Sequence, residues 1–521
     1  MKRRRLCRSA LWFGLWLAAI CVTVTPPALA QTVLRIPIPA DPIMNPVIGT
    51  DAAAVPVNRF LYDSLTRPDP KTLEPRPGLA TEWSARTDGL VWTFKLVRNA
   101  KWHDGKPFTA EDVKYTYDVI LDPKQNSPRR SAIAVVREVR VVDPYTVSFE
   151  LAQPLASFPT IASYNVGIVP KHVLEGREHA KAADFNTKRP ITTGPYRIVE
   201  AVPGDHYIFE ATPDYFGGRA RIERVVFKVI PDVNTQVAQL QSGELDFAVI
   251  QPTNIPGARA ARNVKLQTVP FLGFEHVSFN YRHPLFADAK VRQAMVYALD
   301  RESILKSILA GHGTLATGPI PPLFGWAYND ALKPYAFDPA RAQQLLKEAG
   351  WDKSPDGTLT KDGKPFEFEL GVDKGNPTRE RIALAAQQAY RALGMKVNLK
   401  VEEWPVYAKK LLAKAWDVHV GFWVLPPDPE LTNYYAPDQA FNTINYNNPQ
   451  VTSLLQRGRQ IIDLKERGRL YREMQKVMYD DPPGAIVYYP VDIRAMRANL
   501  SVPELPFREA LQWREIWSYS N

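Results

Sequence analysis

The sequence predicts an α/β protein of two or three domains, and three observations support this prediction. The chain has 521 residues, which is more than a single hydrophobic core normally organises. A strand, a helix and a second strand follow one another between Val225 and Ile250, a pattern typical of a parallel or mixed sheet. A further run of alternating strands and helices from Phe274 to Val401 predicts a second α/β domain.

The first thirty residues have the pattern of an export signal. A basic start precedes an apolar run from Leu11 to Val24, and Ala28-Leu29-Ala30 is a typical cleavage site. We therefore predict a signal peptide over residues 1–30, with cleavage after Ala30. Arg3-Arg4-Arg5 leaves twin-arginine export open beside the general secretory route, and Cys21 leaves a lipid anchor open.

Removing this signal changes what composition implies. Both cysteines, Cys7 and Cys21, lie within it, so the mature chain has no disulfide, thiolate metal site or cysteine nucleophile. The signal also holds five of the 65 basic residues and none of the 55 acidic ones, which leaves the mature chain at +5. A charge this small for such a size gives no reason to expect nucleic acid as a partner.

The N-terminal half alternates between turns and short elements. Asp88-Gly89 is a turn before a strand with one buried face at Trp92–Leu96, and Thr109–Asp112 matches a capping box that begins a helix. The remaining expected elements are a hairpin of Val135–Val142 with Thr146–Leu151, strands at Arg197–Ala201, His206–Glu210 and Val225–Ile230, a helix at Val233–Ser242 that ends at Gly243, and a strand at Leu245–Ile250.

The C-terminal half has stronger helical periodicity. Apolar residues from Val291 to Leu299 fall on one helical face, and Asp300 and Asp338 are expected to cap the two helices that follow. Gly350 ends the second of these. Further expected elements are strands at Phe366–Val372, Val397–Val401 and Ala485–Tyr489, and helices at Arg379–Leu393 and Leu470–Met478.

A series of short motifs runs along the chain in a fixed order and spacing. These motifs are GLATEW at 78–83, DGLVWTF at 88–94, WHDGKPFTAEDV at 102–113, TGPY at 193–196, PDYF at 213–216, SGELD at 242–246, VRQA at 291–294 with ALDR at 298–301, and LLKEAG at 345–350. In this order the chain resembles the family 5 extracellular solute-binding proteins, which are dipeptide, oligopeptide and nickel receptors. The resemblance runs from about Val33 to about Leu500.

The resemblance implies an α/β, two-lobed periplasmic binding protein fold, type II and cluster C-like. Lobe I would comprise 31–271 and 489–521, with an extra subdomain at about 68–190, and lobe II would comprise 272–488. Two chain crossings, near 269–273 and 488–490, would form a two-strand hinge. The lobes would close around a ligand by rotation about this hinge, and the membrane permease would recognise the closed form.

The resemblance also points to a ligand-contacting segment at Gly421–Pro429. Peptide receptors of the family carry an aspartate a few residues after the tryptophan that corresponds to Trp423, and it pairs with the ligand's α-amino group. Here that position falls on Leu425 or Pro426, so free-amine peptides are in doubt, and the local pattern is closer to the nickel receptors. Our candidate ligand-binding residues are Trp423, Asp428, Trp404, Tyr407, Tyr434 and Tyr435, because aromatic residues with a few polar groups commonly line small-molecule sites.

The sequence favours a receptor over an enzyme. It has no G-x-S-x-G elbow, no H-E-x-x-H and no Walker A motif, so we name no catalytic residue, no metal ligand and no cofactor. His419 is interpreted as a locally hydrogen-bonded strand residue.

The expected ligand is a peptide or peptide-like solute, with a non-peptide organic solute or a nickel chelate as alternatives. The remote alternative for the function is a periplasmic hydrolase. The expected partners are an inner-membrane ABC permease and its ATPase subunits, with the receptor itself a monomer.

Overall fold

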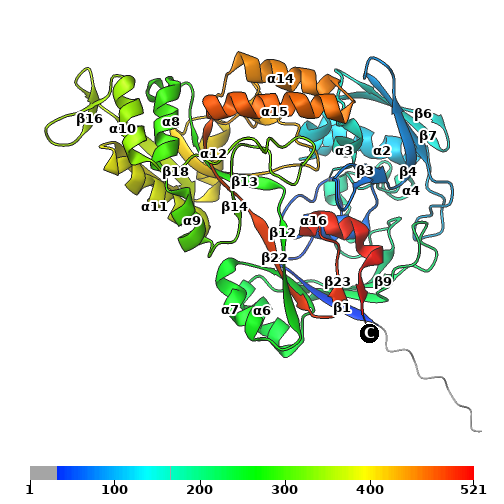
Figure 1. Ribbon diagram of the computed structural model, residues 1–521. Coiled ribbons are helices and arrows are strands. Elements are labelled where there is room, and N and C mark those ends of the chain that lie inside the picture. The colour runs from blue at the N-terminus through cyan, green and yellow to red at the C-terminus, as the bar shows by residue number, and fades with distance from the viewer. Residues whose placement is uncertain (1–31, 165, 521) are drawn as a thin grey trace, which may run out of the picture.

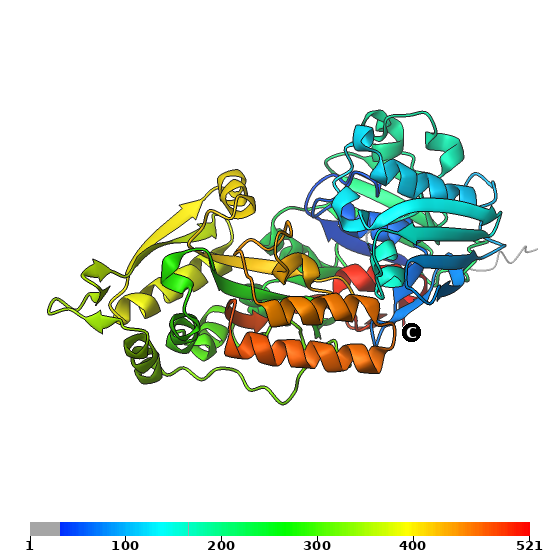
Figure 2. The same cartoon turned by 90° about the horizontal axis from the view of Figure 1, so that it is seen from above.

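The computed structural model describes residues 32–164 and 166–520, so the predicted signal peptide and its cleavage site lie outside the described residues. Two lobes lie side by side, and segments from both ends of the chain meet in one of them (Figures 1 and 2). Within the described part of the chain, no helix is both long and apolar enough to cross a membrane.

Lobe I is built on two small sheets. In the first, β1 (Val33–Ile38) pairs in parallel with β10 (Arg224–Val229), and β9 (His206–Ala211) and β8 (Tyr196–Val202) follow in antiparallel order. In the second, β22 (Val491–Arg497) lies between β11 (Phe247–Ile250) and β12 (Val264–Pro270). Both the N-terminal strand and a strand near the C-terminus therefore belong to this lobe.

The expected subdomain is an antiparallel sheet covered by a helix. Its strand order is β4 (Ala80–Ala85), β5 (Val91–Leu96), β7 (Thr146–Leu151) and β6 (Val136–Asp143). Helix α2 (Ala110–Leu121) begins as predicted, because the Asp112 carboxylate accepts a hydrogen bond from the Thr109 backbone nitrogen at 3.0 Å. The short helix α3 (Phe158–Ser163) follows β7.

Lobe II contains a mixed six-stranded sheet. Its strands, in spatial order, are β14 (Thr314–Leu315), β21 (Gly484–Tyr489), β13 (Gly273–Phe279), β20 (Val418–Val424), β18 (Glu367–Asp373) and β19 (Lys396–Glu402). One apolar cluster joins Val277 and Phe279 of β13 to the buried faces of four helices. These helices are α8 (Ala289–Ala298), α9 (Arg301–Ile308), α10 (Pro339–Glu348) and α11 (Pro377–Ala392).

Two chain crossings join the lobes. Strand β12 ends at Pro270 and β13 begins at Gly273, while β21 ends at Tyr489 and β22 begins at Val491. The crossings lie together, since the backbone nitrogen of Phe271 donates to Pro490 O at 3.0 Å.

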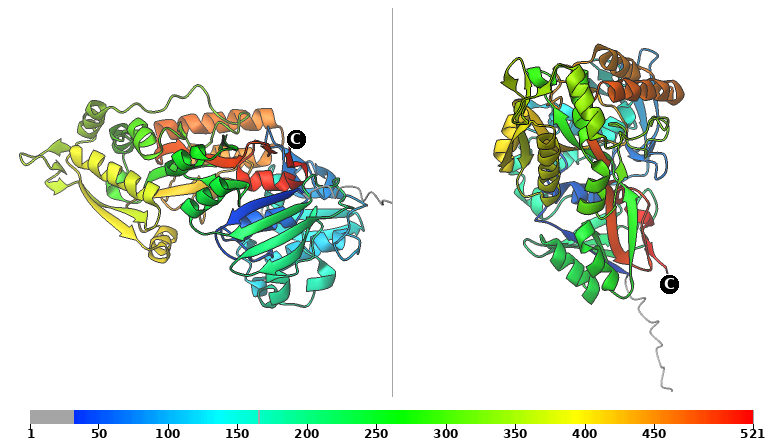
Figure 3. Two further views of the ribbon diagram at one scale, coloured as in Figure 1. Left: turned by 90° about the horizontal axis from the view of Figure 1, so that it is seen from below. Right: turned by 60° about the vertical axis from the view of Figure 1, so that its left-hand side comes forward.

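A third connection is non-covalent: the backbone nitrogen of Ala156 donates to Arg459 O at 2.6 Å. It ties the subdomain to helix α14 (Pro449–Gln460), which packs on α15 (Leu464–Asp480). In Figure 3 this helical hairpin (orange) extends from lobe II toward the subdomain.

One prediction about the sheets is wrong. The strands on either side of α6 (Val233–Ser242) were expected to share a sheet, but β10 belongs to the four-stranded sheet and β11 to the three-stranded one. The reason is that β22, which arrives from the C-terminal end of the chain, pairs with β11 over its whole length. Local periodicity identifies the strands but contains no information about such a distant partner.

Candidate functional site

Strand β20 positions the segment that the sequence singles out for ligand contact. It pairs antiparallel with β13, and Trp423 lies opposite Phe274 while Gly421 lies opposite His276. Because side chains alternate across a strand, Trp423 and His276 share one face of the sheet, and the helix-covered face is the other. The chain leaves the sheet after Val424 and runs into the proline-rich loop at residues 425–429.

An aromatic cluster forms on this open face. The Trp423 ring lies 5.0 Å from that of Tyr434 and 5.7 Å from that of Phe441, and it stacks on His276 at 6.1 Å. The Tyr434 hydroxyl, from the short helix α13 (Thr432–Tyr435), donates to Val424 O at 3.2 Å. Burial raises the pKa of Tyr434, with a smaller effect from Tyr164 of lobe I. This aromatic cluster therefore lies against the opposite lobe.

Two histidines lie beneath the cluster in neutral form. The His276 and His419 rings are 5.4 Å apart, and both are buried. Burial lowers the pKa of His419 to about 3 and that of His276 well below its usual value. His276 Nδ1 lies 2.7 Å from the Ser278 hydroxyl, whereas no described group bonds to Nε2 of either ring. The predicted local bond thus forms at His276 rather than at His419.

A large cavity lies between the subdomain and lobe II. Its volume is about 490 Å³, and we call it the tryptophan cavity after Trp83, Trp92 and Trp326. The subdomain side comes from the ends of β4 and β5, from the start of α3 and from Glu74. The lobe II side comes from the loop after β20 and from the beginning of α15. The full lining is Leu73, Glu74, Pro75, Trp83, Ser84, Ala85, Trp92, Ala156, Ser157, Pro159, Thr160, Trp326, Pro427, Asp428, Ile462, Leu464 and Arg467.

Asp428 lines this cavity, but its charge is already paired. Its carboxylate accepts a hydrogen bond from Arg467 of α15, and the two side chains are only 8% and 3% exposed. Burial lowers the pKa of Arg467, but Asp428 outweighs that effect and the net shift is upward. A ligand cation at Asp428 would have to compete with this guanidinium. Glu74, in contrast, lines the cavity without an ion-pair partner among the described residues.

The other sequence candidates lie apart from the cavity. Trp404 begins α12 (Trp404–Leu412) and is 56% exposed, while Tyr407 on the same helix is buried and donates its hydroxyl hydrogen bond to Val420 O at 2.7 Å. Tyr435 is buried beside Tyr446, with rings 5.7 Å apart. These residues stay predictions, and none of them lines the tryptophan cavity.

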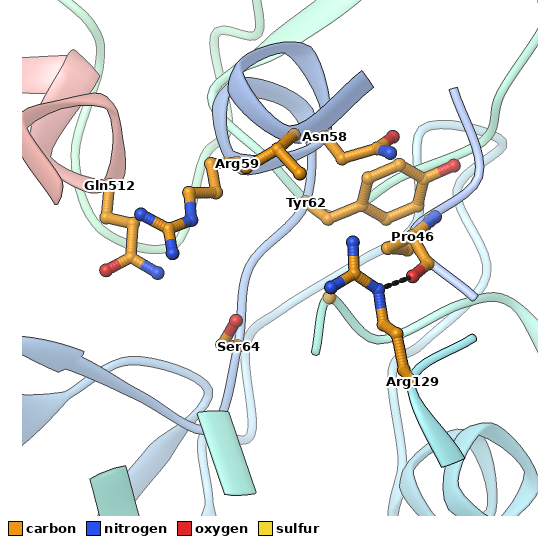
Figure 4. Close-up of a pocket in the computed structure, with 9 residues that line it drawn as sticks. Pro46, Asn58, Arg59, Tyr62, Ser64, Arg129 and Gln512 are labelled. Carbon is orange, nitrogen blue, oxygen red and sulfur yellow. Dashed lines mark hydrogen bonds between the residues drawn. The ribbon is translucent and has the colours of Figure 1, made fainter. Parts of the chain in front are cut away.

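Sequence reasoning missed a basic group on the lobe I side. A small cavity, which we call the basic cavity, contains about 10 Å³ and is lined by Pro46, Val55, Asn58, Arg59, Tyr62, Ser64, Arg129, Gly167 and Gln512. Figure 4 shows the Arg59 and Arg129 guanidinium groups on its two sides. Arg59 bonds to Glu509 at 2.6 Å and lies over the Tyr164 ring at 4.8 Å. No local pattern in the sequence marks Arg129 as part of a site.

A third, small cavity lies between these two. It shares Pro75, Thr160 and Pro427 with the tryptophan cavity and Gln512 with the basic cavity. Tyr164, which neighbours both Arg59 and Tyr434, also lines it. Of the three cavities, only the tryptophan cavity has room for more than about one water-sized group.

Comparison with known proteins gives the family. Residues 74–443 match the model of the bacterial extracellular solute-binding proteins, family 5. The chain is 34% identical over 468 residues to the oligopeptide-binding protein AppA of Bacillus subtilis, covering 88% of this chain and 86% of that protein. It is 28% identical over 518 residues to the dipeptide-binding protein of Escherichia coli, covering 93% and 94%.

Solved structures agree with this assignment. AppA of Bacillus subtilis in complex with a nonapeptide has a TM-score of 0.78 at 31% identity, covering 94% of this chain and 100% of that one. NikZ of Campylobacter jejuni in complex with Ni(L-His) has a TM-score of 0.77 at 28% identity, covering 93% and 99%. Together with the two-lobed α/β architecture, these matches show that the chain belongs to the family 5 bacterial extracellular solute-binding proteins.

Proposed function

We propose that this protein is the substrate-binding receptor of an ABC importer and that it captures a peptide or peptide-like solute between its lobes. The tryptophan cavity is the observation that carries the proposal. Its volume of about 490 Å³ is within the usual range for small-molecule sites, and both lobes contribute to its lining. The indole faces suit apolar side chains, and the nonapeptide bound to AppA of Bacillus subtilis supports a peptide ligand.

The mechanism is capture by closure and contains no chemical step. Residues 31–271 with 489–521 move as lobe I and 272–488 as lobe II, about the crossings at Phe271 and Pro490. A ligand that touches Trp83 on one side and Trp326 on the other makes both contacts only when the lobes are together, so it favours the closed form. The inner-membrane permease, with its ATPase subunits, receives the ligand from that form, and the ligand is released unchanged.

The site of action follows from the N-terminal sequence. The chain is exported to the periplasm after cleavage behind Ala30 and works there as a monomer.

The experiment is native mass spectrometry of the mature chain, residues 31–521, purified from periplasm and then mixed with a synthetic library of peptides of three to nine residues. We expect discrete added masses that fragment as peptides, and a smaller radius of gyration in solution scattering when they bind. Retention of a metal-sized or non-peptide organic mass, with no peptide retained from the library, would refute the peptide class.

A further inference from the structure

Two hydrogen-bonding groups on the subdomain side of the tryptophan cavity lack a partner. Trp92 and Ser157 both line this cavity, and each is only 3% exposed. The indole Nε1 of Trp92 and the Oγ of Ser157 make no hydrogen bond to any described residue. A buried donor without a partner costs free energy, and buried indole N–H groups usually find an acceptor. The two atoms therefore point to an acceptor that the described residues do not supply.

The two groups belong to neighbouring parts of one wall. Trp92 lies on β5, and its ring is 6.2 Å from that of Phe158, which follows Ser157 in the chain. Ser157 is the N-cap of α3, but its side chain makes no capping hydrogen bond, so the helix does not use the hydroxyl. The preceding residue, Ala156, donates its backbone hydrogen bond to Arg459 of lobe II. Ser157 is thus held where the subdomain meets lobe II.

The charges in the lining favour a neutral acceptor over an anion. Asp428 and Arg467 neutralise each other, while Glu74 has no ion-pair partner among the described residues. The lining therefore has a net negative charge, which repels a carboxylate. An indole N–H is a donor only, and a serine hydroxyl can also donate. An uncharged carbonyl oxygen, which accepts through two lone pairs, meets both requirements.

We propose that Trp92 and Ser157 are specificity-determining residues that donate hydrogen bonds to an amide carbonyl of the ligand. The proposal rests on the proposed function and deepens it, because it names the chemical group that the subdomain recognises in the tryptophan cavity. An amide carbonyl has two sources in a peptide, the backbone and the side chain of an Asn or Gln. The subdomain then takes part in recognition and is more than a support for lobe I.

Ser157→Ala separates ligand contact from stability. The Ser157 hydroxyl has no partner among the described residues, so its removal should leave the melting temperature unchanged. In titration calorimetry it should weaken a peptide retained from the library of three to nine residues about three- to tenfold. Ser163→Ala is the matched control, because Ser163 is buried at the other end of α3 but accepts a hydrogen bond from the Thr66 backbone nitrogen at 2.8 Å and does not line the tryptophan cavity. This control should lower the melting temperature and leave the affinity unchanged.

The Trp92 donor is tested by its own resonance. Trp92→Phe keeps an aromatic ring and removes the N–H, so the indole signal that is missing from its spectrum is that of Trp92. In the unaltered chain this signal should move downfield when the retained peptide binds, because a hydrogen bond to the N–H forms. The measurement does not depend on the stability of Trp92→Phe beyond what is needed to assign one signal.

The source of the carbonyl is identified on the ligand side. In a series of the retained peptide, each backbone amide in turn becomes a thioamide, whose sulfur is a weak acceptor. A loss of about three- to tenfold at one position, which disappears in Ser157→Ala, assigns a backbone carbonyl. The same loss on replacing an Asn or Gln of the peptide by Leu assigns a side-chain amide.

Other outcomes overturn the proposal. Unchanged affinity in Ser157→Ala, or an indole signal of Trp92 that does not move, means that water alone meets these donors. The proposal then fails while the proposed function stands, and it fails in the same way if neither the thioamide series nor the side-chain replacements alter the affinity. Retention of no peptide from the library overturns the proposed function, and the proposal with it.

Discussion

The Asp428–Arg467 pair provides the sharpest test of how the site is built. Asp428 follows strand β20, and Arg467 lies in the first turn of α15. If the pair is structural, removing either charge should destabilise the protein strongly, whereas removing both should be tolerated better. If Asp428 is instead held ready for a ligand cation, Asp428→Asn should abolish binding and leave stability nearly unchanged.

The magnitude follows from burial. The Arg467 and Asp428 side chains are 3% and 8% exposed, so water cannot solvate the partner that remains after a single substitution. Breaking a buried ion pair from one side typically costs about 3–5 kcal/mol, whereas an apolar replacement of both partners is often close to neutral. We therefore expect a loss of about 3–5 kcal/mol for Asp428→Asn and for Arg467→Met. The double variant should lose at least about 2 kcal/mol less than the sum of the two.

The assay is urea unfolding of the mature chain for the two single variants and the double variant, followed by tryptophan fluorescence, which Trp326 beside Arg467 should report. An exposed pair on the same helix is the control. Arg469 and Glu466 lie 2.8 Å apart with side chains 53% and 44% exposed, and surface pairs contribute at most about 1 kcal/mol. Additive single effects, or an Asp428→Asn loss no larger than that of Arg469→Ala, would refute the structural explanation.

Three further predictions concern other parts of the site. Gly421→Ala would place a Cβ 2.9 Å from the His276 ring and should cost about 1–3 kcal/mol in urea unfolding, while Gly325→Ala, which has open space, should cost far less. His419 binds a proton more readily in the unfolded chain, because burial lowers its folded pKa from 6.5 to about 3. Stability should therefore fall as pH falls through that window, and His419→Gln should flatten melting temperature against pH. Ala85→Trp, which fills the tryptophan cavity, should weaken peptide binding in calorimetry at least tenfold with an unchanged melting temperature; unchanged affinity would place the ligand elsewhere.

Elements defined by neighbouring residues could be predicted from the sequence. Asp300 and Asp338 cap α9 and α10 as expected, accepting hydrogen bonds from the backbone nitrogens of Ser303 and Arg341. The motif-based resemblance also gave the family and the two-lobed fold correctly. The helix caps depend on contacts within a few residues, and the family assignment depends on the order of motifs along the chain. Both kinds of information can be read from one sequence.

Features that depend on distant pairing could not be predicted. Strand β11 joins the sheet of β22, although the two are about 240 residues apart in sequence. The candidate aromatics show the same limit: Trp404 and Tyr407 lie on one helix, yet one is exposed and the other buried. In the sequence, an aromatic residue near a suspected site is consistent with an exposed ligand contact and with a buried core position. Only the packing of α12 on the sheet decides between these two roles.

The side chains that line the two cavities come both from motifs and from segments that no motif marks. Trp83 and Trp92 belong to motifs that hold the subdomain sheet together, and those same strands end at the tryptophan cavity. The basic cavity is assembled from Arg59, Arg129 and Gln512, which no motif joins. The lining of such a cavity cannot be inferred from any one segment, because its members meet only in the folded chain.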